Sequence, residues 1–326
     1  MAQAERRHMI RIETVLCPID FSPITERVLG LAIQVSELFN SRLILHYSNE
    51  NRLSTPEPLN ESGDLRAETS LQGLIARTPS AIHVKSRITT GHAHKSILEL
   101  AGSLPADLIV MGTHGRSGVR DKLLGSTTER VITHSLCPVL TAHDIGHNMI
   151  LPERGDLAVE GRAPVLVPLD LFPHSMTTFD HACGLLEVLP IDLHLLHVIE
   201  PVSADDMRGA THFNVPEFLQ LRVMDARDSL RALIPTGLES RVHVHACVGP
   251  VVKVILDYAT RIAARLIIMG ITRKNILKNL LSGTPAYGVL RGSTCPVWTV
   301  PGSTSSATQV ATDDLRFAGF PHPCKS

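Results

Sequence analysis

This chain of 326 residues lacks two familiar nucleotide-binding motifs, and its cysteines follow no recognisable spacing. It contains no Gly-Lys-Ser or Gly-Lys-Thr, which excludes a P-loop, and no Gly-x-Gly-x-x-Gly, which excludes a dinucleotide-binding fingerprint. The six cysteines form no Cys-x-x-Cys pair and no disulfide framework. We therefore expect a reducing compartment, namely the cytoplasm.

An excess charge of one sign and a long apolar run are also missing. The formal net charge is −1 and the pI is about 7.0, so nucleic acid and anionic membrane surfaces are poor partners. Apolar residues near the N-terminus alternate with polar ones, so we expect neither a signal peptide nor a membrane span of about 20 residues there. The hydrophobic content of 44% is ample for buried cores, and the length indicates about two domains.

Two segments carry the same landmarks in the same order, so the chain contains an internal repeat. Val15-Leu16-Cys17-Pro18-Ile19-Asp20 matches Val165-Leu166-Val167-Pro168-Leu169-Asp170, and Leu45-His46-Tyr47 matches Leu196-His197-Val198. We expect domains at residues 9–143 and 163–301, joined by a linker at 144–162. A mobile tail is expected at 302–326, because that segment is rich in Ser, Thr and Ala.

Strand-like and helix-like segments alternate in each half, which predicts a parallel sheet with helices on both faces. Strands are predicted at 12–19, 42–48, 82–88, 107–111 and 138–142, and then at 165–169, 192–199, 241–248, 266–269 and 296–300. Helices are predicted at 24–39, 60–77, 94–104 and 126–135, and then at 175–188, 215–234, 251–263 and 284–291. Each half is thus predicted to be a five-stranded open α/β sandwich.

One segment of the first half has the residue types of a phosphate-binding loop. Gly112-Thr113-His114-Gly115 follows an apolar strand, and Gly125-Ser126 begins a helix after nine further residues. Glycine lets a backbone N–H approach an anion, and a helix N-terminus favours negative charge. Asp20 and Tyr47 fall at the same carboxyl edge of the sheet, where a carboxylate and a backbone can bind a nucleoside. The set predicts a site for a nucleoside triphosphate.

These segments resemble the universal stress protein family, whose ATP-binding members have glycine, two residues, glycine, nine residues, glycine and then serine or threonine. Gly112, Gly115, Gly125 and Ser126 match every position. The resemblance covers both halves and implies two Rossmann-like, adenine nucleotide alpha hydrolase-like domains with strand order 3-2-1-4-5. Their last strands would pair as in a dimer, within one chain. It also implies a nucleotide-dependent stress-response or signalling protein.

The resemblance implies ATP contacts by position. Asp20 and Tyr47 would lie at the nucleoside, and Met111 with Gly112 beside the ribose. His114 and Arg116 would lie near the phosphates, where Mg²⁺ can bridge phosphate oxygens with water and at most one protein hydroxyl. The whole predicted set is Pro18, Asp20, Tyr47, Met111, Gly112, His114, Gly115, Arg116, Gly125, Ser126 and Thr127.

The second half departs from the pattern. Arg273 replaces the second glycine, and Pro285 removes an N–H just inside the helix. We therefore expect nucleotide in the first half only. A second site, if one forms, would comprise Asp170, Val198, Gly270, Arg273, Gly283 and Thr284.

Other interpretations stay open. An ATPase or nucleotidyl transferase on the same sheet would need a placed water and charge stabilisation, and no dedicated pair of groups is evident. We therefore assign no catalytic residue and expect slow hydrolysis or none. A scaffold without ligand, a further homodimer and unknown signalling partners are the remaining alternatives. His243, His245 and Cys247 alternate on a predicted strand as zinc ligands can, but with no fourth ligand we predict no metal site.

Overall fold

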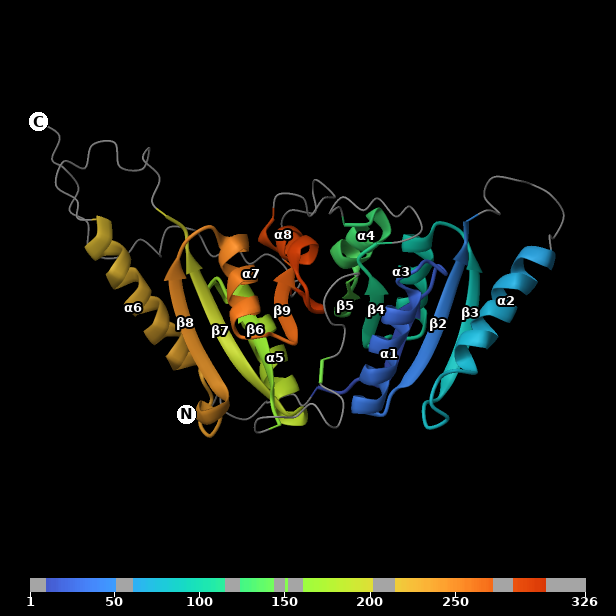
Figure 1. The fold of residues 1–326 in the computed structure, drawn as a ribbon, viewed down its shortest axis with the longest axis horizontal. Helices are drawn as coiled ribbons and strands as arrows, with labels where there is room; N and C mark the ends of the chain where they lie inside the picture. The colour runs from blue at the N-terminus through green and yellow to red at the C-terminus, as the bar shows by residue number, and fades with distance from the viewer. Residues whose placement is uncertain are drawn as a thin grey trace, which may run out of the picture.

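The structure, a computed structural model, describes residues 10–50, 61–114, 124–143, 150–151, 161–201, 215–271 and 284–302. The strands in this part of the chain form one ten-stranded sheet in the order β3-β2-β1-β4-β5-β10-β9-β6-β7-β8 (Figure 1). Each half therefore has the expected order 3-2-1-4-5, and the two five-stranded sheets are continuous with one another.

Residues 10–143, called domain 1 below, alternate strand and helix. The elements are β1 (Thr14–Pro18), α1 (Thr25–Phe39), β2 (Arg42–Asn49), α2 (Glu61–Ile75), β3 (Val84–Thr90), α3 (Ala93–Ser103), β4 (Leu108–Gly112), α4 (Ser126–His134) and β5 (Val139–Ala142). Strands β1 to β5 run parallel to their neighbours within this half.

Residues 161–302, called domain 2, repeat the arrangement. The elements are β6 (Ala163–Pro168), the short 3-10 turn η2 (Pro173–Ser175), α5 (Met176–Val188), β7 (Ile191–Ile199), α6 (Val215–Leu233), the turn η3 (Glu239–Arg241), β8 (Val242–Val248), α7 (Val251–Arg261), β9 (Leu266–Ile271), α8 (Pro285–Gly292) and β10 (Val297–Pro301). All ten predicted strands and eight predicted helices are present, with ends shifted by at most two residues.

The two domains join through their last strands, as expected. Strands β5 and β10 pair antiparallel, with Trp298 opposite Leu140. The hydroxyls of Thr141 and Thr299 donate to Val297 O and Val139 O across this seam, at 3.2 and 3.0 Å. Pairing removes one exposed edge from each domain, because the edge N–H and C=O groups are then bonded.

Helices cover both faces of the sheet. Buried residues of α1, α2, α5 and α6 pack on one face, and those of α3, α4, α7 and α8 on the other (Figure 1). The inner strands are buried on both faces, which explains their nearly continuous apolar runs. Within the described residues, no helix is long and apolar enough to span a membrane.

The sheet register corrects one of the sequence matches. Pro18 pairs with His46 in domain 1, and Pro168 pairs with Leu196 in domain 2. The residue equivalent to Tyr47 is therefore His197, and matching His46 with His197 was wrong by one position. A one-residue slip in a strand moves a side chain to the other face. Val198 accordingly packs with the α7 face of the core, whereas Tyr47 packs with the α1 face.

Part of the segment predicted as a linker lies in the core. Ile150 is fully buried. The side-chain amide of Gln34 on α1 accepts from Ile150 N–H at 2.6 Å and donates to Leu151 O at 2.8 Å. This pair of bonds satisfies backbone groups that burial would otherwise leave without a partner. Most of the rest of that segment, and the tail beyond residue 302, lie outside the described residues.

Candidate functional site

Asp20 stabilises a tight turn just beyond β1. Its Oδ1 accepts from Ser22 N–H at 3.0 Å, and Phe21 between them has a φ of 59°. The left-handed conformation is costly for a bulky residue, so the carboxylate bond has a structural role. The Phe21 ring packs on Tyr47 with ring centroids 5.1 Å apart. Phe21, the neighbour of Asp20, thus links the end of β1 to Tyr47 near the end of β2, at the carboxyl edge of the sheet.

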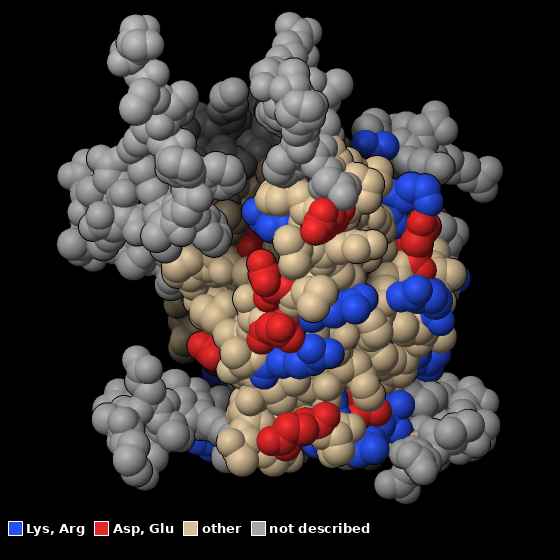
Figure 2. Space-filling view, turned by 90° about the vertical axis from the view of Figure 1, so that its left-hand side faces the viewer, with Lys and Arg blue, Asp and Glu red and all other residues tan. Residues whose placement is uncertain are grey.

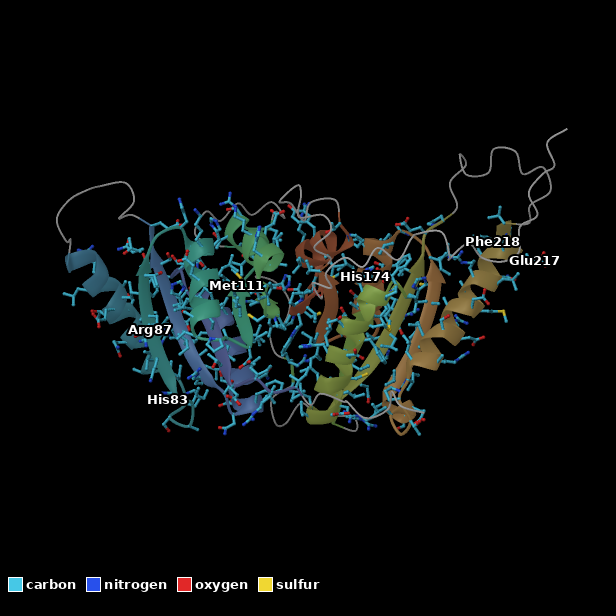
Figure 3. The ribbon with its side chains drawn as sticks, turned by 180° about the vertical axis from the view of Figure 1, so that it is seen from behind. His83, Arg87, Met111, His174, Glu217 and Phe218 are labelled. Carbon is cyan, nitrogen blue, oxygen red and sulfur yellow. The ribbon has the colours of Figure 1, made fainter. Side chains whose placement is uncertain are left out.

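Domain 2 builds the same turn and then adds contacts to it. Asp170 Oδ1 accepts from Phe172 N–H at 3.1 Å, and Leu171 has a φ of 64°. In addition, Asp170 Oδ2 lies 2.9 Å from His174 Nε2, and the Ser175 hydroxyl donates to Oδ1. The Asp170 carboxylate is therefore bonded by side chains of its own domain. Figure 3 labels His174 in domain 2 and Met111 in domain 1, on either side of the seam.

The ends of the predicted phosphate loop are tied together. Gly125 N–H donates to Thr113 O at 2.8 Å, and the Thr128 hydroxyl donates to Gly112 O at 2.7 Å. Thr113 N–H donates to Ala142 O at 3.0 Å, which fixes this end against β5. These bonds bring the end of β4 and the start of α4 together. Gly115 and Arg116 lie outside the described residues.

Packing explains two of the motif glycines. A Cβ on Gly112 would lie 3.0 Å from Ile24 Cγ2 at the start of α1, and one on Gly270 would lie 2.6 Å from Thr178 Oγ1 on α5. Both contacts are tight, so a larger residue at either position would displace the neighbouring side chain on the helix. Because packing favours glycine at both Gly112 and Gly270, these two residues do not by themselves indicate which domain binds a ligand.

The starts of α4 and α8 do differ. Gly125 precedes α4 and has no side chain with which to cap it. Thr284 precedes α8, and its hydroxyl accepts from Tyr287 N–H at 3.3 Å, while Pro285 supplies no N–H at all. The first turn of α8 is thus capped by the protein, whereas α4 begins with backbone donors and a positive helix end at the carboxyl edge.

The profile of the family described as "Universal stress protein family" matches residues 11–143 and 162–301. The chain belongs to this family. A universal stress protein of Mycobacterium tuberculosis, Rv2005c, is 24% identical over 216 residues, covering 66% of this chain and 68% of that protein. Universal stress protein A homolog 1 of Coxiella burnetii is 31% identical over 137 residues, covering 39% of this chain and 92% of that protein.

A solved structure repeats the arrangement of both domains. The crystal structure of a universal stress protein from Archaeoglobus fulgidus has a TM-score of 0.65 and 22% identity, and covers 91% of this chain and 98% of that one. This likeness shows the fold. The chain is thus a tandem universal stress protein with two domains of Rossmann-like type.

His114 of this universal stress protein lies just beyond the end of β4. Its Nδ1 lies 3.0 Å from the Thr113 hydroxyl. Burial and, to a lesser extent, the charge of His114 lower the pKa of His143 to about 3. His143 is therefore neutral at physiological pH.

A group of basic residues lies at the start of α3, where the sequence left His92 and His94 without an assigned role. His92 and His94 have ring centroids 6.0 Å apart, and the first turn of α3 contains no acidic residue. Burial, then the charges of Arg130, His92 and Lys95, lower the pKa of His94, whereas Glu50 opposes this shift. Glu50 Oε1 accepts from Ala93 N–H at 2.7 Å. Cations oppose the helix dipole at an N-terminus. Several basic residues at the start of a predicted helix are therefore the sequence signal that could have identified this group.

The zinc-like pattern of His243, His245 and Cys247 gathers no metal site. Among the residues that the structure describes, no three His, Cys, Asp or Glu side chains are arranged to hold a metal ion. His243 and His245 instead meet His194 of the neighbouring strand β7.

Proposed function

We propose that this universal stress protein binds one ATP per chain, in domain 1, and acts in the cytoplasm as a nucleotide-dependent stress-response protein. One observation carries the proposal. Helix α4 begins at Gly125 with no side-chain cap, whereas α8 is capped by Thr284 and begins with Pro285. An anion stabilises an uncapped helix start through backbone N–H groups and the helix dipole.

The nucleoside end of the proposed site lies over β1 and β2. Asp20 and Tyr47 are both half-buried there, and the ring of Phe21, which follows Asp20, packs on Tyr47. A carboxylate accepts from ribose hydroxyls or from an adenine amino group. In the proposal, Pro18 and Met111 supply neighbouring contacts at the ends of β1 and β4.

The phosphate end lies at Gly125, Ser126 and Thr127. Gly115 and Arg116 would complete it by sequence position. Mg²⁺ binds ATP mainly through phosphate oxygens and water, so the Ser126 hydroxyl is a sufficient protein contribution. The donor set therefore fits a magnesium ion held by the nucleotide.

Hydrolysis is proposed to be slow or absent. Asp20 lies at the nucleoside end and already accepts from Ser22 N–H. Efficient phosphoryl transfer needs a group that orients the attacking water and others that stabilise the charge of the transition state. The described part of the site offers backbone donors and hydroxyls, which bind phosphate without activating water. Occupancy by nucleotide, rather than turnover, is then the signal.

Titration calorimetry tests this proposal on the full chain with ATP and Mg²⁺. The expected stoichiometry is one ATP per chain. Asp20→Asn keeps an oxygen for Ser22 N–H but removes the charge, and should weaken binding about tenfold, since a bond to a charged group contributes about 1.5–3 kcal/mol.

Asp170→Asn is the matched control and should leave the affinity unchanged. Two ATP molecules per chain would contradict the assignment to domain 1. An absence of saturable binding, together with no nucleotide in mass spectra of gently purified protein, would instead support a scaffold without ligand.

A further inference from the structure

Three histidines gather on the outer two strands of domain 2. His194 of β7 pairs in register with His243 of β8, and His245 lies two residues further on the same face. The His194 ring centroid is 4.7 Å from that of His243 and 6.0 Å from that of His245. Because β8 is the last strand of the sheet, this cluster stands at its outer edge.

Helix α7 covers the cluster with an aromatic ring. Tyr258 is 4% exposed, and its ring centroid lies 4.7 Å from that of His245 and 6.2 Å from that of His194. The Tyr258 hydroxyl lies 3.5 Å from His194 Nδ1. The Arg261 guanidinium lies over the Tyr258 ring, 4.4 Å from its centroid. The histidines thus contribute to the packing of α7 against the sheet.

The charged groups around the cluster are mostly positive. Arg261 faces it from α7, and Arg227 reaches the edge from α6, where its Nη2 donates to Ala246 O at 3.4 Å. Cys247 is the remaining titratable group on β8. Two carboxylates on the same elements already have cations, since Asp192 pairs with Arg162 at 3.2 Å and Asp257 with Lys253 at 2.5 Å. Figure 2 shows both signs of charge interspersed over this end of the molecule.

Two of the three histidines, His194 and His245, have lowered pKa values in the folded state. Burial, followed by the charges of His243 and His245, lowers the pKa of His194 to about 4. Burial, followed by Arg261, His243 and Arg227, also lowers the pKa of His245. An opened state restores the ordinary value near 6.5, so it binds more protons. Opening is therefore favoured progressively as the pH falls from about 6.5 toward 4.

Domain 1 has different residues at the same places. Ile44 pairs with Lys85 in the register position of His194 and His243. Arg87, labelled on the outer strand β3 in Figure 3, takes the place of His245. His46 of β2 is also buried with a lowered pKa, but it bonds the Thr89 hydroxyl at 2.8 Å and stands outside any histidine cluster. The cluster is thus a property of domain 2.

We propose that the His194–His243–His245 cluster is an acid-sensitive contact, which releases α7 and β8 from the rest of domain 2 when the imidazoles become protonated. The charged rings then repel one another and Arg261. The effect extends to α8, because α7 and α8 pack without spare room: a Cβ on Gly288 would lie 2.7 Å from Val252. This inference is independent of nucleotide binding.

Hydrogen exchange of the full chain, followed by mass spectrometry in EDTA at pH 7.0 and 5.0, tests the proposal. Rates are corrected for the intrinsic effect of pH. Protection of α7 and β8 should fall at least about tenfold between these two values, since His194 alone favours opening by about twentyfold over the interval.

His194→Ile, which installs the residue found at position 44, should abolish most of this fall and leave the exchange of domain 1 unchanged. His194→Gln is the second variant, and it keeps a polar but non-titrating side chain. A tenfold fall that persists in both variants would overturn the proposal. So would equal protection of α7 and β8 at the two pH values in the parent protein.

Discussion

Helices α4 and α8 occupy equivalent places in the two domains but begin in different ways. Both follow a strand with a glycine at or next to its end, Gly112 in β4 and Gly270 in β9. Both also end at a serine whose hydroxyl donates to a cysteine carbonyl two residues on. Only α8 has a side-chain cap and a proline in its first turn. The comparison teaches that one backbone arrangement can present two different helix starts: at α8 the protein itself satisfies a backbone donor, whereas at α4 the donors remain available for the proposed ligand.

The same comparison shows which residues carry information about binding. Asp20 and Asp170 both accept a backbone N–H two residues on, so each aspartate has a structural role in its turn. Gly112 and Gly270 both pack closely against the neighbouring helix, which favours glycine in either domain. The informative differences are those that change the number of donors at the phosphate end, namely Thr127 against Pro285 and Gly115 against Arg273.

The largest expected effect concerns the seam, where Trp298 of β10 faces its own equivalent, Leu140 of β5. Trp298 is fully buried, and its ring contacts His181 at 5.4 Å between centroids. Trp298→Ala should lower the free energy of unfolding by about 3–5 kcal/mol through loss of buried area and a residual cavity. Urea unfolding followed by circular dichroism measures this change.

Trp298→Phe is the matched control. The indole Nε1 is buried with no acceptor among the described residues, so removal of this N–H loses no hydrogen bond. The control should therefore cost less than about 1.5 kcal/mol. If Trp298→Ala and Trp298→Phe lowered the free energy of unfolding equally, the stability of the seam would not depend on an aromatic ring at this position.

The elements of the fold followed from the sequence, because apolar periodicity and turn residues mark each strand and helix locally. The pairing of last strands came from the family resemblance, and β5 and β10 confirm it. The register of β7 did not follow from the sequence. Leu45-His46 and Leu196-His197 are identical dipeptides, yet the hydrogen-bonded register makes His46 equivalent to Leu196, one residue away from that match. A two-residue identity is weaker than the requirement that one face be buried.

Contacts between distant elements were the least predictable. Gln34 binds Ile150 and Leu151 across more than a hundred residues, and a polar residue in a helix gives no sign of such a partner. His194 joins His243 and His245 only because β7 and β8 are neighbours. The phosphate-end residues, in contrast, lie close together along the chain, so spacing alone brought Gly112 and Gly125 into one hypothesis.

A smaller effect is expected when domain 1 receives the helix start of domain 2. Thr127→Pro removes one backbone N–H at a position where α8 tolerates proline. ATP affinity should fall about 10- to 100-fold, because a hydrogen bond to a charged group contributes about 1.5–3 kcal/mol. Titration calorimetry measures the affinity, and thermal unfolding verifies that α4 remains folded.

The reverse exchange sharpens the same point. Arg273→Gly combined with Pro285→Thr restores the glycine spacing and the N–H in domain 2, and should create a second, weaker ATP site. Pro285→Thr alone is the control, because its ATP affinity shows how much of the gain depends on the replacement of Arg273. Were Thr127→Pro to bind ATP as the parent does, the difference between α4 and α8 would have no bearing on nucleotide binding.

The smallest expected effect concerns the contact between α3 and α4. Domain 1 places His94 and Arg130 where domain 2 places Val252 and Gly288, which pack tightly against each other. Basic groups beside two helix starts favour an anion with several charges over one with few. His94→Val with Arg130→Ala should therefore weaken ATP binding about two- to fivefold and leave AMP binding nearly unchanged.

Lys253→Ala, in the first turn of α7, is the matched control and should change neither affinity. A parallel loss of ATP and AMP affinity would mean that His94 and Arg130 act on the packing of α3 rather than on phosphate, and a fall in the thermal unfolding temperature would accompany it.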